Sequence, residues 1–163
     1  MLRNALVIVL CCLSVAACTD VRSMRRARDV EGLVSLLSDE DPQVRVKAID
    51  ALGYVSDTRA IRPLLKALND DDPYVREHAA RNLGCDYHSS LGCDSNETTD
   101  GLIKALRDRD VFVRVEAVRS LGEHPREQTR SVLEEVAAND ERWEPRQAAA
   151  FALGRIGSNE SLP

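Results

Sequence analysis

The residues of this sequence that could do chemistry are an adjacent pair, Glu77 and His78, and a small group of cysteines. A carboxylate beside an imidazole can act as an acid–base couple or can bind a metal ion. A metal centre needs several such ligands that converge from different elements. Whether the pair has a chemical role therefore depends on whether the sequence around it occurs once in the chain or is repeated.

The stretch around this pair, VREHAARNLG, is repeated along the chain. Its three relatives, VRVKAIDALG, VRVEAVRSLG and PRQAAAFALG, begin at Val44, Val113 and Pro145. The closing glycines are Gly53, Gly84, Gly122 and Gly154, spaced by 31, 38 and 32 residues. Only one of the four blocks holds a Glu-His pair, so the repetition favours a solvated helix face over a catalytic or metal-binding role for His78.

Each block follows another apolar run with helical spacing, so each repeat is predicted to be a helix, a turn and a second helix. Asp41 before Pro42, and Asp72 before Pro73, match an N-cap residue followed by a first-turn proline. The closing glycines match left-handed C-caps. One helix pair cannot bury its own apolar stripe, so the units are predicted to stack as an all-α solenoid of about four helix pairs.

Composition narrows the class of protein. The chain is 44% hydrophobic and 30% charged, but aromatic residues make up only 4%. Ala, Leu and Val must therefore supply the core, which suits closely stacked helices. The formal net charge of -5 argues against nucleic-acid binding, because phosphate contacts need a surplus of Lys and Arg.

The repeated pattern D-P-x-V-R-x-x-A-x-x-x-L-G, over residues 29–157, resembles the HEAT-repeat family, specifically the short HEAT-like repeats of bilin lyases. The predicted units cover about 29–54, 55–85, 97–123 and 126–157, with a tail at 158–163. The resemblance implies a solenoid with a polar ladder formed by Asp41 with Arg45, Asp72 with Arg76, and Asp110 with Arg114. The fourth unit departs from the pattern, with a turn expected to be two residues longer and Pro145 in place of Val.

The resemblance implies no particular activity, because such repeats occur in scaffolds, adaptors and some enzymes. One enzyme with this fold, deoxyhypusine hydroxylase, binds two irons through His-Glu pairs in successive units. Here the order is Glu-His, and the other units lack the pair. No Ser-His-Asp arrangement or phosphate-binding glycine loop is present, so the sequence predicts no catalytic residue and no cofactor.

The N-terminal segment predicts export. Residues 1–17 have an early Arg, a short apolar run and small residues before Cys18, as in a signal peptide. Val15-Ala16-Ala17-Cys18 resembles the bacterial lipobox, which implies that Cys18 is acylated and becomes the mature N-terminus. Simple cleavage after Ala17 is the alternative. Because Thr19 rather than Asp follows Cys18, the resemblance to enterobacterial sorting rules favours the outer membrane, facing the periplasm.

Residues 18–28 are predicted to form a basic tether after the signal peptide. Four arginines, Arg22, Arg25, Arg26 and Arg28, fall within seven residues. They could rest on anionic headgroups, where each charge contributes about 1 kcal/mol. A solvated tether, or the basic start of a first helix, is the equal alternative.

An insertion at 85–97 adds about seven residues between the second and third units, and such loops often carry a repeat protein's function. Cys85 and Cys93 bracket it. In an exported chain with Cys18 acylated these are the free cysteines, so a disulfide is expected. Its stabilisation would be about 2 to 3 kcal/mol. Zinc held by Cys85, His88 and Cys93 is the alternative.

The function that the sequence favours is an exported, lipid-anchored scaffold that binds another protein. The alternatives are an enzyme or metal protein that uses the 85–97 loop, and a structural lipoprotein without a specific partner. The fourth unit's last face is expected to be partly exposed and to associate with itself or with a partner, because terminal repeats usually need a polar cap.

A partner-binding groove is predicted on the second helices. Tyr74 and Phe112 stand just before the buried Val of neighbouring units, and exposed aromatics are enriched at binding hot spots. Arg81 and Arg119 lie two turns further along the same face, which suits an acidic or extended peptide segment. The alternative is that the two aromatics pack locally over the inter-helix turns.

Overall fold

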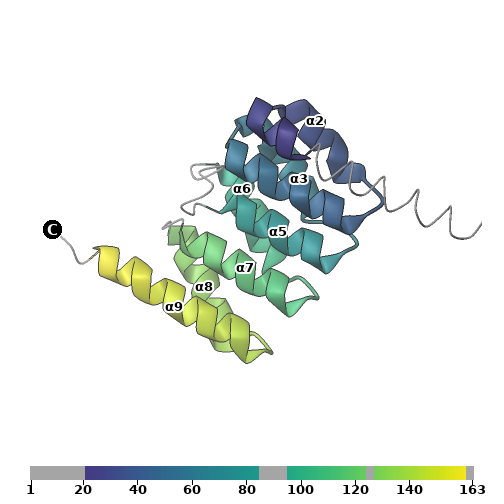
Figure 1. The fold of residues 1–163 in the computed structure, drawn as a ribbon. Coiled ribbons are helices and arrows are strands. Elements are labelled where there is room, and N and C mark those ends of the chain that lie inside the picture. The colour runs from purple at the N-terminus through teal and green to yellow at the C-terminus, as the bar shows by residue number, and fades with distance from the viewer. Residues whose placement is uncertain (1–20, 85–94, 124–126, 161–163) are drawn as a thin grey trace, which may run out of the picture.

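The computed structural model describes residues 21–84, 95–123 and 127–160, and every regular element in these ranges is a helix (Figure 1). The predicted signal peptide, Cys18 and most of the insertion, with Cys85, His88 and Cys93, lie outside the described residues. None of the described helices is both long and apolar enough to span a bilayer.

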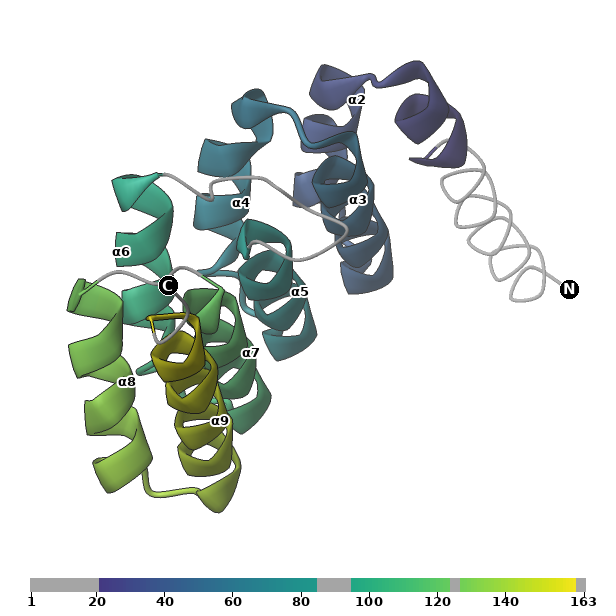
Figure 2. The same ribbon diagram turned by 90° about the vertical axis from the view of Figure 1, so that its left-hand side faces the viewer.

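From Val30 onward, the described helices form four pairs, which confirms the predicted all-α solenoid. The first helices are α2 (Val30–Ser35, continued by the 3-10 helix η1, Leu36–Ser38), α4 (Ile61–Ala67, preceded by η2, Thr58–Ala60), α6 (Asn96–Ala105) and α8 (Glu127–Asn139). The second helices are α3 (Pro42–Val55), α5 (Pro73–Leu83), α7 (Val111–Gly122) and α9 (Trp143–Glu160). Each set forms its own row, and successive units lie side by side (Figures 1 and 2).

Aspartate side chains cap the N-termini of three of the second helices, as the sequence predicts for Asp41 and Asp72. Oδ1 of Asp41, Asp72 and Asp110 accepts a hydrogen bond from the N–H two residues later, at 2.9, 2.8 and 2.8 Å. Each carboxylate satisfies an N–H that has no partner within the helix. Each contact joins residues only two positions apart, so residue type and spacing in the sequence are enough to predict it.

The core runs between the two rows. Val44, Ala48 and Leu52 of α3 are buried, and so are the equivalent Val, Ala and Leu residues of α5 and α7. In α9, Pro145 takes the place of the Val and is buried as well. First helices contribute Leu33, Leu64, Leu102 and Leu133, all fully buried. The stripe that each pair could not bury alone is therefore covered by its neighbours.

The repeated glycines do not end the second helices as left-handed C-caps. Gly53 and Gly154 lie inside α3 and α9, and Gly122 is the last residue of α7. Gly84, which follows α5, has an extended backbone with φ −71° and ψ 167°. Of the residues that follow α3, it is Ser56, its C-cap, that has left-handed geometry, at φ 52°. The prediction of glycine C-caps is therefore wrong.

The glycines instead let neighbouring second helices approach closely. A β-carbon on Gly53 would stand 1.8 Å from Oδ1 of Asn82, one on Gly84 2.6 Å from Oγ of Ser120, and one on Gly122 2.7 Å from Cβ of Ala152. These contacts join α3 to α5, α5 to α7, and α7 to α9. Each glycine thus makes room for the next unit along the array.

The segment expected to be a basic tether is helical over residues 21–27. Val21 is buried against the array, and Met24 packs beside it. The Arg25 guanidinium lies over the Tyr54 ring, 4.9 Å from its centroid, and Nη2 of Arg28 donates to the Val55 carbonyl at 2.7 Å. This segment therefore covers the first unit.

Candidate functional site

An arginine ladder links the units, but through different aspartates than predicted. Arg45 pairs with Asp70, Arg76 with Asp108 and Arg114 with Asp140, each through two hydrogen bonds of 2.8 to 3.0 Å. Each partner belongs to the next unit. The predicted partners Asp41, Asp72 and Asp110 are occupied as N-caps instead. The pairing implied by the family resemblance is therefore wrong, although a ladder exists.

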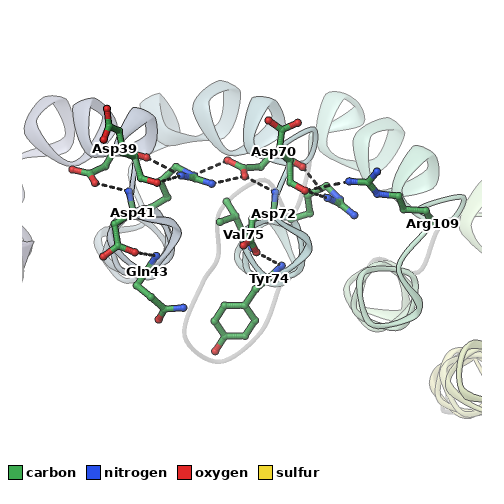
Figure 3. Close-up of polar contacts among 12 residues, drawn as sticks. Asp39, Asp41, Gln43, Asp70, Asp72, Tyr74, Val75 and Arg109 are labelled. Atoms are coloured by element: carbon green, nitrogen blue, oxygen red, sulfur yellow. Dashed lines mark hydrogen bonds and ion pairs between the residues drawn. The ribbon is translucent and has the colours of Figure 1, made fainter. Parts of the chain in front are cut away.

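Each ladder aspartate stands two residues before the N-cap position of its unit. Figure 3 shows Asp39 and Asp41 in one turn and Asp70 and Asp72 in equivalent places in the next. Oδ1 of Asp70 accepts from the N–H of Asp72 at 2.9 Å, in addition to one hydrogen bond from Arg45. Nη1 of Arg76 donates back to the Asp70 carbonyl at 2.8 Å. The turn and both units are thus held together.

The fourth unit keeps this spacing, so its turn is not longer. Nη1 of Arg146 donates to the Asp140 carbonyl at 2.8 Å, as Arg76 does to the Asp70 carbonyl. Both arginines follow the acceptor residue by six positions. The difference lies in residue type, because Arg142 stands where the other units have the capping Asp.

The ladder charges stabilise one another. Hydrogen bonding to Asp108 raises the pKa of the Arg76 guanidinium, although burial opposes this. Burial alone would raise the pKa of Asp108, but hydrogen bonds from Arg76 and from the Asp110 N–H hold it below its usual range. Asp140 behaves in the same way. The hydrogen bonds of the ladder described above all join groups of this chain to one another. The role of the ladder is therefore to fix the stacking of the units.

Glu77 and His78 contact different partners. Oε1 of Glu77 accepts from Arg81 at 2.6 Å, whereas Nδ1 of His78 lies 2.8 Å from Oδ1 of Asp50 on α3. His78 is only 8% exposed, so the predicted solvated face is wrong for this residue. Its side chain lies where α5 contacts α3. Among the described residues, no group of three ligands could hold a metal ion.

The second helices α5, α7 and α9 line a groove with a volume of about 710 Å³. Phe112 lines it, as do Arg81 and Arg119, so three of the four predicted partner-binding residues meet there. Phe112 is 62% exposed. Tyr74 is half-exposed and stands outside the groove lining, with its ring edge-on to His78 at 4.5 Å. For Tyr74 the structure thus shows a local contact.

The charged residues of the groove pair with one another. Arg81 donates to Glu77 at 2.6 Å and to Glu116 at 3.3 Å, and Arg119 lies 3.8 Å from the second oxygen of Glu116. Further along, Arg155 pairs with Glu123. Burial lowers the pKa of Arg81, but the two carboxylates outweigh it and raise the value overall. The groove is therefore close to neutral.

The sequence also carries a direct family signature. A model of HEAT repeats matches residues 30–91 and 99–163, which together exceed half of the chain. The chain belongs to the HEAT-repeat family. The predicted resemblance to the fold of HEAT-like proteins is thereby confirmed.

Solved structures show how far the HEAT-repeat fold is shared. A chain in the complex of CpcE and CpcF of phycocyanin lyase from Nostoc sp. PCC7120 matches with a TM-score of 0.70 and 21% identity, over 85% of this chain and 89% of that one. An engineered protein matches with a TM-score of 0.55 and 24% identity, over 86% of this chain and 67% of that one. No curated protein sequence matches this HEAT-repeat chain. At these identities the matches show the fold alone.

Two aromatic residues of the groove were missed by the sequence analysis. Trp143 and Phe151, both on α9, are 59% and 71% exposed and line the groove opposite Phe112. The signal for Phe151 was available, because it occupies the same HEAT-repeat position as Arg81 and Arg119. Trp143 stands where the other units have Pro or Val, one residue before the position of Tyr74 and Phe112. The repeat pattern therefore gave no signal for an aromatic residue there.

Proposed function

We propose that this protein is an exported, lipid-anchored HEAT-repeat scaffold that holds another protein in the groove of α5, α7 and α9. The observation that carries the proposal is the exposure of Phe112, Trp143 and Phe151 around one groove. Large aromatics are normally buried, and exposed groups of them mark interaction sites.

The chemistry of the groove favours an extended segment or helix that presents apolar side chains. Arg81 and Glu116 are already paired, so an apolar partner would not leave them as unpaired charges. Arg119, whose side chain is 69% exposed, remains accessible at the edge and can attract an acidic residue. The aromatic rings would supply most of the affinity, with the paired charges as a polar rim.

The solved structure with a TM-score of 0.70 is a complex of two proteins, CpcE and CpcF. This supports a partner-binding role for the present fold, because the same helix-pair array is found there in a protein–protein assembly. HEAT repeats present long rows of equivalent helices, which provide extended binding surfaces.

Partner capture tests this proposal. Cross-linked complexes would be isolated from detergent-solubilised membranes with the natural protein and with a Phe112→Ala, Phe151→Ala double variant. We expect the double variant to lose its specific partner while its melting transition stays within a few degrees of the natural value. Tyr54→Ala is the matched control, since Tyr54 is an exposed aromatic on α3 away from the groove.

Two results would contradict the proposal that a partner binds in the groove. Equal capture by the double variant would place the partner elsewhere. Early unfolding of the double variant, by several kcal/mol, would show that the aromatics belong to the core.

The lipid anchor rests on the lipobox-like sequence that ends at Cys18. Mass spectrometry of the membrane-extracted protein should find an acylated N-terminal Cys18, and Cys18→Ala should block that processing. An unmodified chain that begins at Cys18 would exclude the anchor. The anchor and the groove are tested separately, so one can fail without the other.

A further inference from the structure

The outer face of α9 has the features that α3, α5 and α7 use to bind the next unit. Five residues after the Val position, Ile49, Ala80 and Val118 are fully buried. The equivalent residue of α9, Ala150, is exposed. Gly154 is also exposed, and nothing lies within 4 Å of where its β-carbon would stand. In the described residues, then, no unit covers this face, as Figure 1 shows for α9 at the end of the row.

The residues on this face follow helical spacing. Trp143, Arg146, Ala150, Gly154 and Gly157 are separated by three or four positions, so they lie on one side of α9. Trp143 is 59% exposed. No β-carbon contact would arise at Gly157 either. The large side chains stand in the first half of the helix and the glycines in the second half.

This order makes the face complementary to itself. Trp143 and Gly157 are both seven residues from Ala150, and Arg146 and Gly154 are both four residues from it. If two copies of α9 pack antiparallel, with Ala150 against Ala150, each Trp143 faces a glycine. The stem of each Arg146 then lies over the other glycine. Large side chains thus meet open space at both ends, as close packing requires.

We infer that this face binds a second copy of the chain through a twofold axis at Ala150. Twofold contacts are the commonest in homo-oligomers, and each uses the same surface patch on both subunits. This inference goes beyond partner capture, which uses Phe112 and Phe151 in the groove, whereas the outer face of α9 shares only Trp143 with the groove lining.

Other arrangements of two copies fit less well. A parallel pair of α9 helices would place Trp143 against Trp143 and glycine against glycine, which leaves both a clash and a gap. A head-to-tail contact would bring α9 against the first unit of the next copy. That end is covered by the helical segment 21–27, whose Val21 is buried there. The antiparallel pair of α9 helices leaves the segment 21–27 in place.

The oligomeric state of the purified protein tests the inference. Sedimentation equilibrium with a reducing agent, which removes any disulfide between chains, is expected to show a dimer at about 100 µM protein, as a small interface allows. Ala150→Lys should convert it to a monomer at the same concentration, because two like charges would meet on the axis. Ala138→Lys is the matched control on an exposed position of α8 and should leave the dimer intact.

A charge exchange makes the test specific for the axis. Ala150→Glu should also give a monomer, and mixing it with the Ala150→Lys protein should restore a dimer of one copy each. Only an axis that places residue 150 against itself predicts this rescue. A monomeric natural protein, a dimer unaffected by Ala150→Lys, or a mixture that stays monomeric would each overturn the inference. Far-UV circular dichroism would confirm that all variants remain helical.

Discussion

Arg76 and Asp108 are 32 residues apart in the sequence and form two parallel hydrogen bonds of 2.8 Å each. Their side chains are only 5% and 12% exposed. Such a bidentate pair fixes orientation as well as distance, because the guanidinium fork and the carboxylate are both planar. It joins the second unit to the third unit. The sequence between the two residues includes the insertion, so this contact holds the array together where the repeat is interrupted.

Removing one partner of this pair should cost stability. In Asp108→Asn, the buried Arg76 keeps its bonds to backbone carbonyls but loses its counter-charge, and we expect a loss of about 2 to 4 kcal/mol. Urea denaturation followed by circular dichroism measures the change. Asp71→Asn, at an exposed position of the preceding turn, is the control and should change stability by less than about 0.5 kcal/mol. Similar losses in both variants would mean that the ladder is not stabilising.

Stability should fall in acid. The folded protein holds the pKa values of Asp108 and Asp140 below their usual range. Their contribution is therefore complete above the unfolded-state value of about 3.9 and is lost as the pH falls through the lower folded-state values. We expect these groups to leave stability unchanged from pH 8 to 5 and to reduce it below about pH 4. Asp108→Asn should show a smaller loss between pH 6 and 3, and an equal loss would contradict this origin.

Equivalent glycines should respond in opposite ways to alanine. Gly122→Ala places a β-carbon 2.7 Å from Cβ of Ala152, and the overpacking should outweigh the gain in helix propensity, for a net loss of about 1 kcal/mol. Gly154→Ala meets no atom within 4 Å and should stabilise the protein by about 0.5 to 1 kcal/mol. Thermal unfolding at low protein concentration compares the two. Stabilisation in both variants would show that the helix contact at Gly122 is loose.

The predicted disulfide concerns Cys85 and Cys93, which lie outside the described residues. Peptide mapping of the exported protein without reducing agent should find the two cysteines joined. Reduction should lower stability by about 2 to 3 kcal/mol. Free thiols together with bound zinc would favour the alternative metal site, and free thiols without metal would exclude both.

Much of the fold could be predicted from the sequence. The four second helices, the buried Val, Ala and Leu stripe and the aspartate N-caps all follow from patterns that repeat within about ten residues. Of the candidate site, Phe112, Arg81 and Arg119 line one groove, and their role in partner binding stays a prediction. His78 was misjudged because its burial depends on α3, and a single helix pattern does not show which neighbour approaches each face.

Local chemistry determined the helix pairs, since an N-cap or an apolar stripe requires only residues that are close in sequence. Tertiary structure alone decided which aspartate each arginine binds. Asp72 is nearer to Arg76 in the sequence than Asp108 is, but its carboxylate caps α5, and the stacking of the third unit brings Asp108 to the guanidinium. The glycines follow the same rule. Their spacing was visible in the sequence, but their role depends on how closely the next helix approaches, which only the packed array sets.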